Sequence, residues 1–134
     1  MYYYEKDYIM RLIHESAAML ARMLFGRKED GGGITEVLTA EGREHHDYLR
    51  SLVDEGRINE AEDRLFEIIE SAAWEDRQKA ALIIGFYDDV NSRDDEFLAR
   101  ADFSREEIVR GLEDAMKAVH MEIPEYLRIS ESGW

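Results

Sequence analysis

The chain has 134 residues, enough for one hydrophobic core, and its 31 Asp and Glu against 17 Lys and Arg give a formal net charge of -14 at pH 7. This charge repels phosphate backbones and anionic lipid headgroups, so we expect neither nucleic acid nor a membrane surface as a partner. The chain contains no cysteine, which excludes disulfides and thiolate chemistry and is compatible with a reducing cytoplasm, the location we expect.

No segment has the pattern of a targeting or membrane-spanning sequence. The first residues lack the basic start, apolar stretch and small-residue cleavage site of a signal peptide. The longest apolar run, Ala80 to Tyr87, has eight residues, whereas a transmembrane helix needs roughly 20. We therefore expect neither a signal peptide nor a membrane span.

Residues 5–25 are predicted to form a helix with a broad apolar surface. One apolar line recurs every three or four positions, and a second line runs beside it. The first line consists of Ile9, Ile13, Ala17, Leu20 and Leu24, and the second of Leu12, Met19 and Met23. A surface this wide needs two neighbouring helices or a second chain to cover it, so internal packing and a homodimer through this helix are both open.

A glycine-rich stretch, residues 27–33, is predicted to be a flexible connector. A second helix should begin near Thr35 or Thr39 and run to about Glu55. Its expected core line passes through Gly42 and His45, and a glycine in a helix interior costs roughly 1 kcal/mol relative to alanine. The first half of this helix is therefore the weakest part of the pattern.

The segment from Leu49 to Glu70 contains two apolar stripes at helical spacing, separated by Gly56. Glycine ends helices in a left-handed conformation, so the segment is predicted to be an antiparallel helical hairpin at the centre of the fold. Asn59 and Glu62 are spaced for a capping box at the start of its second helix, which should end near Ala72.

Three further helical segments are predicted towards the C-terminus. The first is a helix over residues 74–90, and the second is a single helical turn over residues 96–101. The third is a helix that begins after Ser104, which forms a capping box with Glu107, and is stopped by Pro124. Residues 125–134 are predicted to be a C-terminal tail, and residues 1–134 to form a single helical domain.

The segment from Gly56 to Ala61, with Leu65 and Ile68 behind it, resembles the turn and second helix of a tetratricopeptide repeat (TPR). The likeness covers about 25 residues. No closing proline and no second copy follow, and stable solenoids need about three stacked repeats. The resemblance therefore implies a TPR-like local geometry and no solenoid.

Two other stretches, Asp7 to Ile13 leading to Gly26 and Phe103 to Ile108 followed by Gly111 and Leu112, resemble a group of small uncharacterised proteins of Gram-positive bacteria. That group is a domain of unknown function. The resemblance implies a helical fold and a bacterial cytoplasm, and no activity.

The residues that could carry chemistry are few. Glu41 and His45 share a helix face at the spacing by which a helix offers two metal ligands, but a third ligand would have to come from His14 or His120. The acidic stretch from Asp88 to Glu96 fails as a calcium loop, because an aspartate stands where glycine is required and an arginine where the last glutamate is required. We expect no cofactor.

The sequence thus predicts an all-α protein, a bundle of four to five helices. We interpret it as a non-catalytic protein-interaction or adaptor domain, homodimeric through its first helix. The alternative is a metal-dependent helical-bundle enzyme or ligand-binding protein that uses Glu41 and His45.

Overall fold

A computed structural model describes residues 2–26, 34 and 36–121 and confirms the all-α class. Its described residues contain six helices and no strand; the predicted connector, residues 27–33, and tail, residues 125–134, lie outside them. The helices are α1 (Tyr2–Phe25), α2 (Ala40–Asp54), α3 (Ile58–Ser71), α4 (Asp76–Asn91), α5 (Asp95–Arg100) and α6 (Arg105–Ala118). No helix in this part of the chain is both long and apolar enough to cross a membrane.

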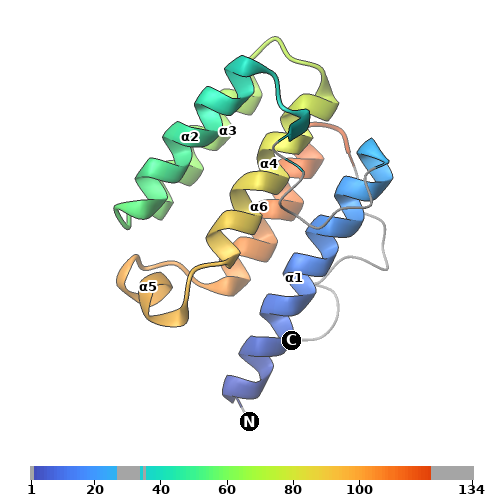
Figure 1. The fold of residues 1–134 in the computed structure, drawn as a ribbon. Coiled ribbons are helices and arrows are strands. Elements are labelled where there is room, and N and C mark those ends of the chain that lie inside the picture. Colours follow the sequence, from blue (N-terminus) through green and yellow to red (C-terminus); the bar gives the residue numbers. More distant parts are fainter. Residues whose placement is uncertain (1, 27–33, 35, 122–134) are drawn as a thin grey trace.

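Helices α2 and α3 lie side by side, α4 and α6 form a second pair, and α1 packs on the far side of that pair (Figure 1). Two contacts show that α1 and α4 are antiparallel. The Arg77 guanidinium donates a hydrogen bond to the Leu24 carbonyl at one end, and the Asn91 amide donates one to the Met10 carbonyl at the other.

Helices α2 and α4 run parallel. At one end the Thr39 backbone N–H donates to the Gln78 side chain, and at the other the Arg93 guanidinium lies 2.8 Å from the Asp54 carboxylate. Because α3 is antiparallel to α2 and α6 is antiparallel to α4, α3 and α6 also run parallel where they meet behind the view of Figure 1.

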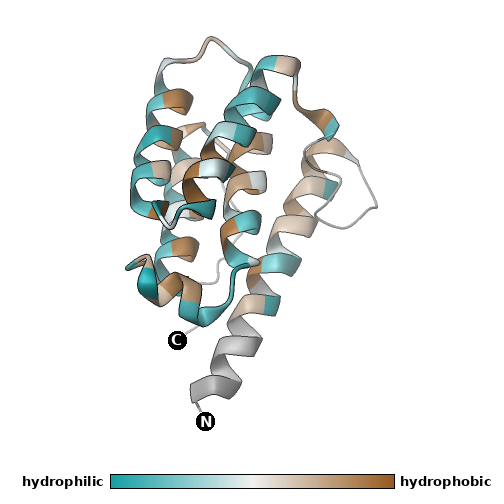
Figure 2. Ribbon diagram, turned by 60° about the vertical axis from the view of Figure 1, so that its left-hand side comes forward, coloured by the Kyte–Doolittle hydropathy of each residue, from teal (hydrophilic) through white to brown (hydrophobic). Residues whose placement is uncertain are grey.

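The centre of the bundle is α4, not the α2–α3 hairpin that we expected there. Every residue from Ala80 to Tyr87 is buried, since α1, α2 and α6 all pack against this helix. A helix that is apolar on all sides has to be enclosed, whereas an amphipathic hairpin can form an outer layer. Figure 2 shows the hydrophobic residues of the outer helices on their inner sides.

The hairpin is antiparallel, and its turn forms as predicted. Gly56 has φ 81°, and the N–H of Arg57 bonds to the carbonyl of Leu52, which ends α2 in a left-handed C-cap. The predicted capping box of Asn59 and Glu62 is wrong. Helix α3 begins at Ile58 without a side-chain cap, because both residues bond to other elements instead.

The fold has six helices rather than four to five because the turn after α4 is a helix in its own right. The Asp94 carboxylate accepts a hydrogen bond from the Phe97 N–H and caps α5. The predicted box at the start of α6 is confirmed, since Ser104 and Glu107 bond to each other's backbone N–H groups.

Candidate functional site

The two apolar lines of α1 have different environments. Ile13, Ala17 and Leu20 of the first line are between 0% and 3% exposed, because they pack into the core. On the second line, Met19 is half-buried and Met23 is 51% exposed. The described neighbours of α1 therefore cover one line and leave part of the second open to solvent.

A shallow cavity of about 500 Å³ lies between α1 and the C-terminal end of α4. Its lining combines apolar and polar groups: Met10, Arg11, His14, Asp88, Asn91 and Ser92. Among the described residues, a 3.1 Å contact between His14 Nδ1 and Asp88 Oδ1 links the side chains of α1 and α4 at this cavity. An acid and a base thus meet here, but His14 is half-exposed and its partner already holds it.

Asn91, at the floor of this cavity, links α1 to α6. Its side chain is 2% exposed; the amide nitrogen donates to the Met10 carbonyl, and the amide oxygen accepts from Arg105 Nη1 at 2.9 Å. Arg105 also donates to the backbone carbonyls of Asn91 and Arg93. Carbonyls at the C-terminal end of a helix have no partner within the helix, so these bonds satisfy acceptors at the end of α4. These bonds tie three helices together and identify Asn91 and Arg105 as structural residues.

The structure brings Glu41 and His45 together, with their Oε2 and Nε2 atoms 3.9 Å apart. The His45 ring packs on Trp74 at 5.6 Å between ring centroids, and the buried histidine of α2 is His46 rather than His45. His14 is engaged with Asp88 on α4. Within the described ranges, no three His, Cys, Asp or Glu side chains form a group that could hold a metal ion.

The carboxylates between Asp88 and Asp95 bind protein groups. Asp88 contacts His14, and Asp89 lies 3.0 Å from Arg93. Asp94 caps α5, and Asp95 pairs with Arg105. These contacts hold the turns between α4 and α6 in place.

Sequence reasoning missed one polar cluster, formed by α3, α4 and α6. The Tyr87 hydroxyl donates a 2.6 Å hydrogen bond to Glu62 Oε2, and Gly111 leaves the space that both groups occupy. Burial raises the pKa of Glu62, with further increases from Glu107 and other carboxylates, although the bond from Tyr87 opposes them. The one available signal was a glycine in the middle of a strongly amphipathic helix.

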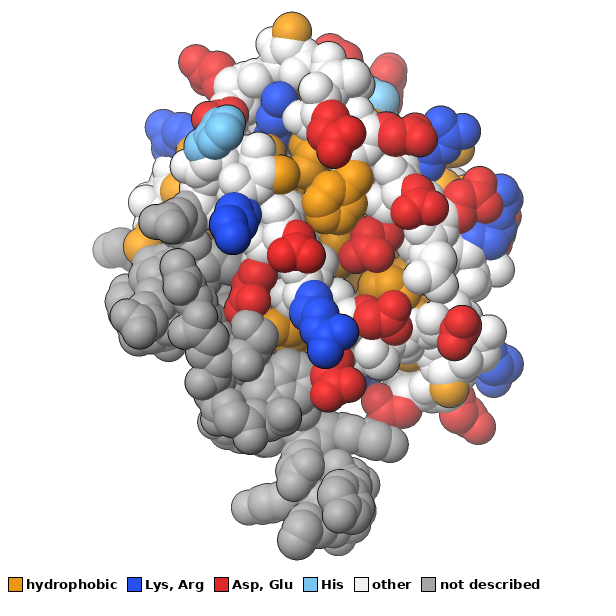
Figure 3. All heavy atoms as spheres, turned by 180° about the vertical axis from the view of Figure 1, so that it is seen from behind, with side chains coloured by type: hydrophobic (Ala, Val, Ile, Leu, Met, Phe, Trp, Pro, Cys, Tyr) orange, Lys and Arg blue, Asp and Glu red, His pale blue; other side chains and the backbone are white. Residues whose placement is uncertain are grey.

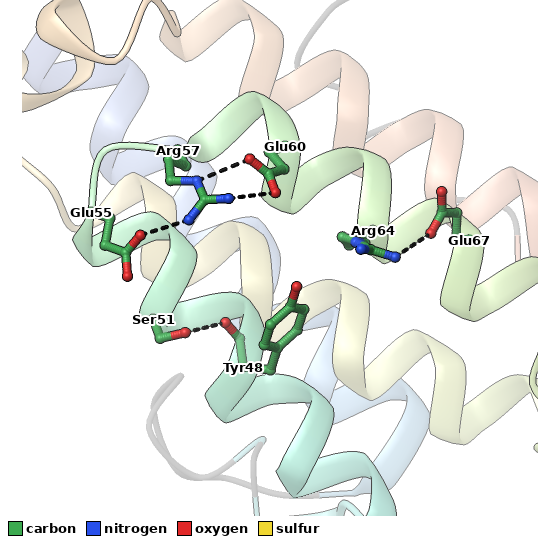
Figure 4. Close-up of polar contacts among 7 residues, drawn as sticks. All are labelled: Tyr48, Ser51, Glu55, Arg57, Glu60, Arg64 and Glu67. Atoms are coloured by element: carbon green, nitrogen blue, oxygen red, sulfur yellow. Dashed lines mark hydrogen bonds and ion pairs between the residues drawn. The ribbon is translucent and has the colours of Figure 1, made fainter.

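On the exposed face of the α2–α3 hairpin, arginine side chains pair with glutamates (Figure 4). Arg57 bonds to both Glu55 and Glu60, and Arg64 bonds to Glu67. Glu60 and Arg64 have i,i+4 spacing, but Glu60 pairs with Arg57 and Arg64 pairs with Glu67. Tyr48, which is 44% exposed, lies beside these pairs.

Comparison with known proteins identifies a family but no activity. The search of curated proteins and the search of solved structures found no match. A family model matches residues 3–120, a span that runs from the second residue of α1 past the end of α6. The chain therefore belongs to the family of unknown function DUF6483.

Proposed function

We propose that the protein is a non-catalytic interaction domain of the cytoplasm that forms a homodimer through α1. The observation that carries this proposal is the partly uncovered second apolar line of α1, on which Met23 is 51% exposed and Met19 half-buried. Exposed methionines on a helix suit protein contacts, because the thioether side chain adapts to the partner's shape.

The charges beside this line suit an antiparallel copy. Glu15 and Arg22 are both exposed and lie seven residues apart, so they share one side of α1. If two copies of α1 cross between Ala18 and Met19, Glu15 of each copy lies opposite Arg22 of the other. The dimer would then bury the methionines between two ion pairs related by the twofold axis.

Ile13 and Leu20 cannot form the dimer surface, because the core of the same chain already buries them. Charged substitutions there would unfold the protein whatever its oligomeric state. The test must therefore use exposed positions of α1.

The experiment is sedimentation equilibrium on the wild type and four variants. We expect a dimer for the wild type, a monomer for Met23→Glu, and a weakened dimer for Glu15→Arg alone. The double variant Glu15→Arg with Arg22→Glu should restore the dimer, since it exchanges the paired charges. Tyr48→Glu, a charge placed on an exposed aromatic residue of α2, is the matched control and should leave the dimer intact.

A monomeric wild type at all concentrations would refute the homodimer. An unchanged dimer in Met23→Glu would show that another surface forms it. Circular dichroism of each variant establishes that helicity is retained, so that a change in mass reports on association alone.

A further inference from the structure

The face formed by α3 and α6 combines a half-buried aromatic ring with unbalanced negative charge. Glu62 and Phe66 are four residues apart on α3 and so share one flank of that helix. The Glu62 carboxylate lies against α6, because a Cβ placed on Gly111 would be 2.4 Å from its Oε2 atom. Phe66 is thus one turn further along the seam between the two helices, where it is half-buried.

Carboxylates surround this part of the seam. On α6, Glu107 precedes Gly111 by one turn and Asp114 follows it by almost one turn, and on α3 Asp63 is adjacent to Glu62. All three act on Glu62 as like charges and add to the effect of burial in raising its pKa. Each of the three is therefore close enough to repel the Glu62 carboxylate in the folded protein.

The carboxylates of this cluster lack ion-pair partners within the part of the chain that the structure describes. None of the arginine or lysine side chains in that part forms an ion pair with Glu62, Asp63, Glu107 or Asp114. On the hairpin face, by contrast, arginines pair with the glutamates (Figure 4). Figure 3, which views the molecule from behind, shows hydrophobic side chains on this face with many Asp and Glu and some Lys and Arg side chains around them.

We propose that the α3–α6 face binds a basic amphipathic helix of another protein. Apolar side chains of that helix would lie on Phe66, and its lysine or arginine side chains would pair with the surrounding carboxylates. Polyanions are repelled by this face, and a small cation would make no use of the aromatic ring. A second copy of the chain does not suit this face, because a twofold interface would place its carboxylates against the same carboxylates of the other copy.

The probe is a synthetic helical peptide with leucine on one side and lysine on the other, titrated by fluorescence anisotropy. The double variant Asp63→Lys with Asp114→Lys should bind this peptide at least about tenfold more weakly than the wild type, since it replaces two attractive contacts with repulsive ones. The matched control is Glu44→Lys with Asp47→Lys, which changes the net charge equally at exposed positions of α2 and should weaken binding less than about threefold.

The aromatic contact has its own test. Phe66→Ala should weaken binding about fivefold, and a peptide with alanine in place of leucine should bind weakly and lose its sensitivity to this substitution. Both double variants are checked for wild-type helicity and thermal stability beforehand. Equal weakening in the two double variants would show attraction by overall charge alone and overturn the proposal, as would failure of the wild type to bind the peptide.

Discussion

Replacing Gly111 with alanine tests the packing of α3, α4 and α6 directly. A methyl group at this position would be 2.3 Å from the Tyr87 hydroxyl oxygen, 2.4 Å from Glu62 Oε2 and 2.7 Å from Tyr87 Cζ. Such separations are far below van der Waals contact, so the hydrogen bond between Tyr87 and Glu62 has to move or break. Helix propensity acts in the opposite direction, because alanine in a helix interior is favoured over glycine by about 1 kcal/mol.

The magnitude follows from these opposing effects. Overpacking a core position costs about 1–3 kcal/mol, and losing a hydrogen bond to a charged group costs about 1.5–3 kcal/mol. After subtracting the gain in propensity, we expect Gly111→Ala to lower the free energy of unfolding by about 3 kcal/mol. For a chain of this size the melting temperature should fall by roughly 10 °C.

The assay is urea unfolding followed by circular dichroism. Arg110, exposed on the same helix, supplies the control, since Arg110→Ala should be more stable than Arg110→Gly by about 1 kcal/mol. Tyr87→Phe removes the nearest clashing atom, so its combination with Gly111→Ala should cost at least about 1 kcal/mol less than the sum of the single changes. A Gly111→Ala protein as stable as the wild type would refute the reasoning.

Three further changes have expected outcomes. The pKa of Glu62 is raised, so the folded state holds its proton more tightly, and stability falls as pH rises from the ordinary value of 4.5 through the raised one. Glu62→Gln should therefore be more stable than the wild type at pH 7. Urea unfolding at several pH values should show this gain vanish near pH 4. Asp102 has φ 57°, so Asp102→Gly should raise the free energy of unfolding by about 0.5–1 kcal/mol, whereas Asp102→Ala, which keeps the strain, should not. Asn91→Ala should lower the free energy of unfolding by about 2–3 kcal/mol, because the Met10 carbonyl and Arg105 both lose a buried partner. It should also accelerate amide hydrogen exchange in α1, and unchanged exchange there would contradict this link.

Local features of the fold could be read from the sequence because neighbouring residues produce them. The left-handed turn at Gly56 and the box of Ser104 and Glu107 involve only residues within a few positions of one another. The capping box predicted for Asn59 does not form, because the side chain of Asn59 bonds to residues far away in the sequence. Its amide found the carbonyls of Ala101 and Asp102, more than forty positions away, and spacing along the chain carries no information on such partners.

The candidate sites also combine features that the sequence shows locally with features that depend on packing between distant residues. The spacing of Glu41 and His45 correctly placed them on one face of α2, but the absence of a third ligand nearby among the described residues depends on how the helices pack. The second apolar line of α1 was visible as a pattern. Only packing distinguished it from the first line, by burying Ile13 and leaving Met23 exposed.

The sequence by itself determined the helical class, most helix ends and the strong negative charge, because periodicity, caps and composition are local or additive properties. Tertiary structure alone decided that α4 is the central helix and that Tyr87 meets Glu62 above Gly111. It also decided which acidic side chains find a cation and which remain together at the α3–α6 seam. These outcomes depend on which helix faces meet, and each amphipathic helix could satisfy its own apolar stripe against several different neighbours.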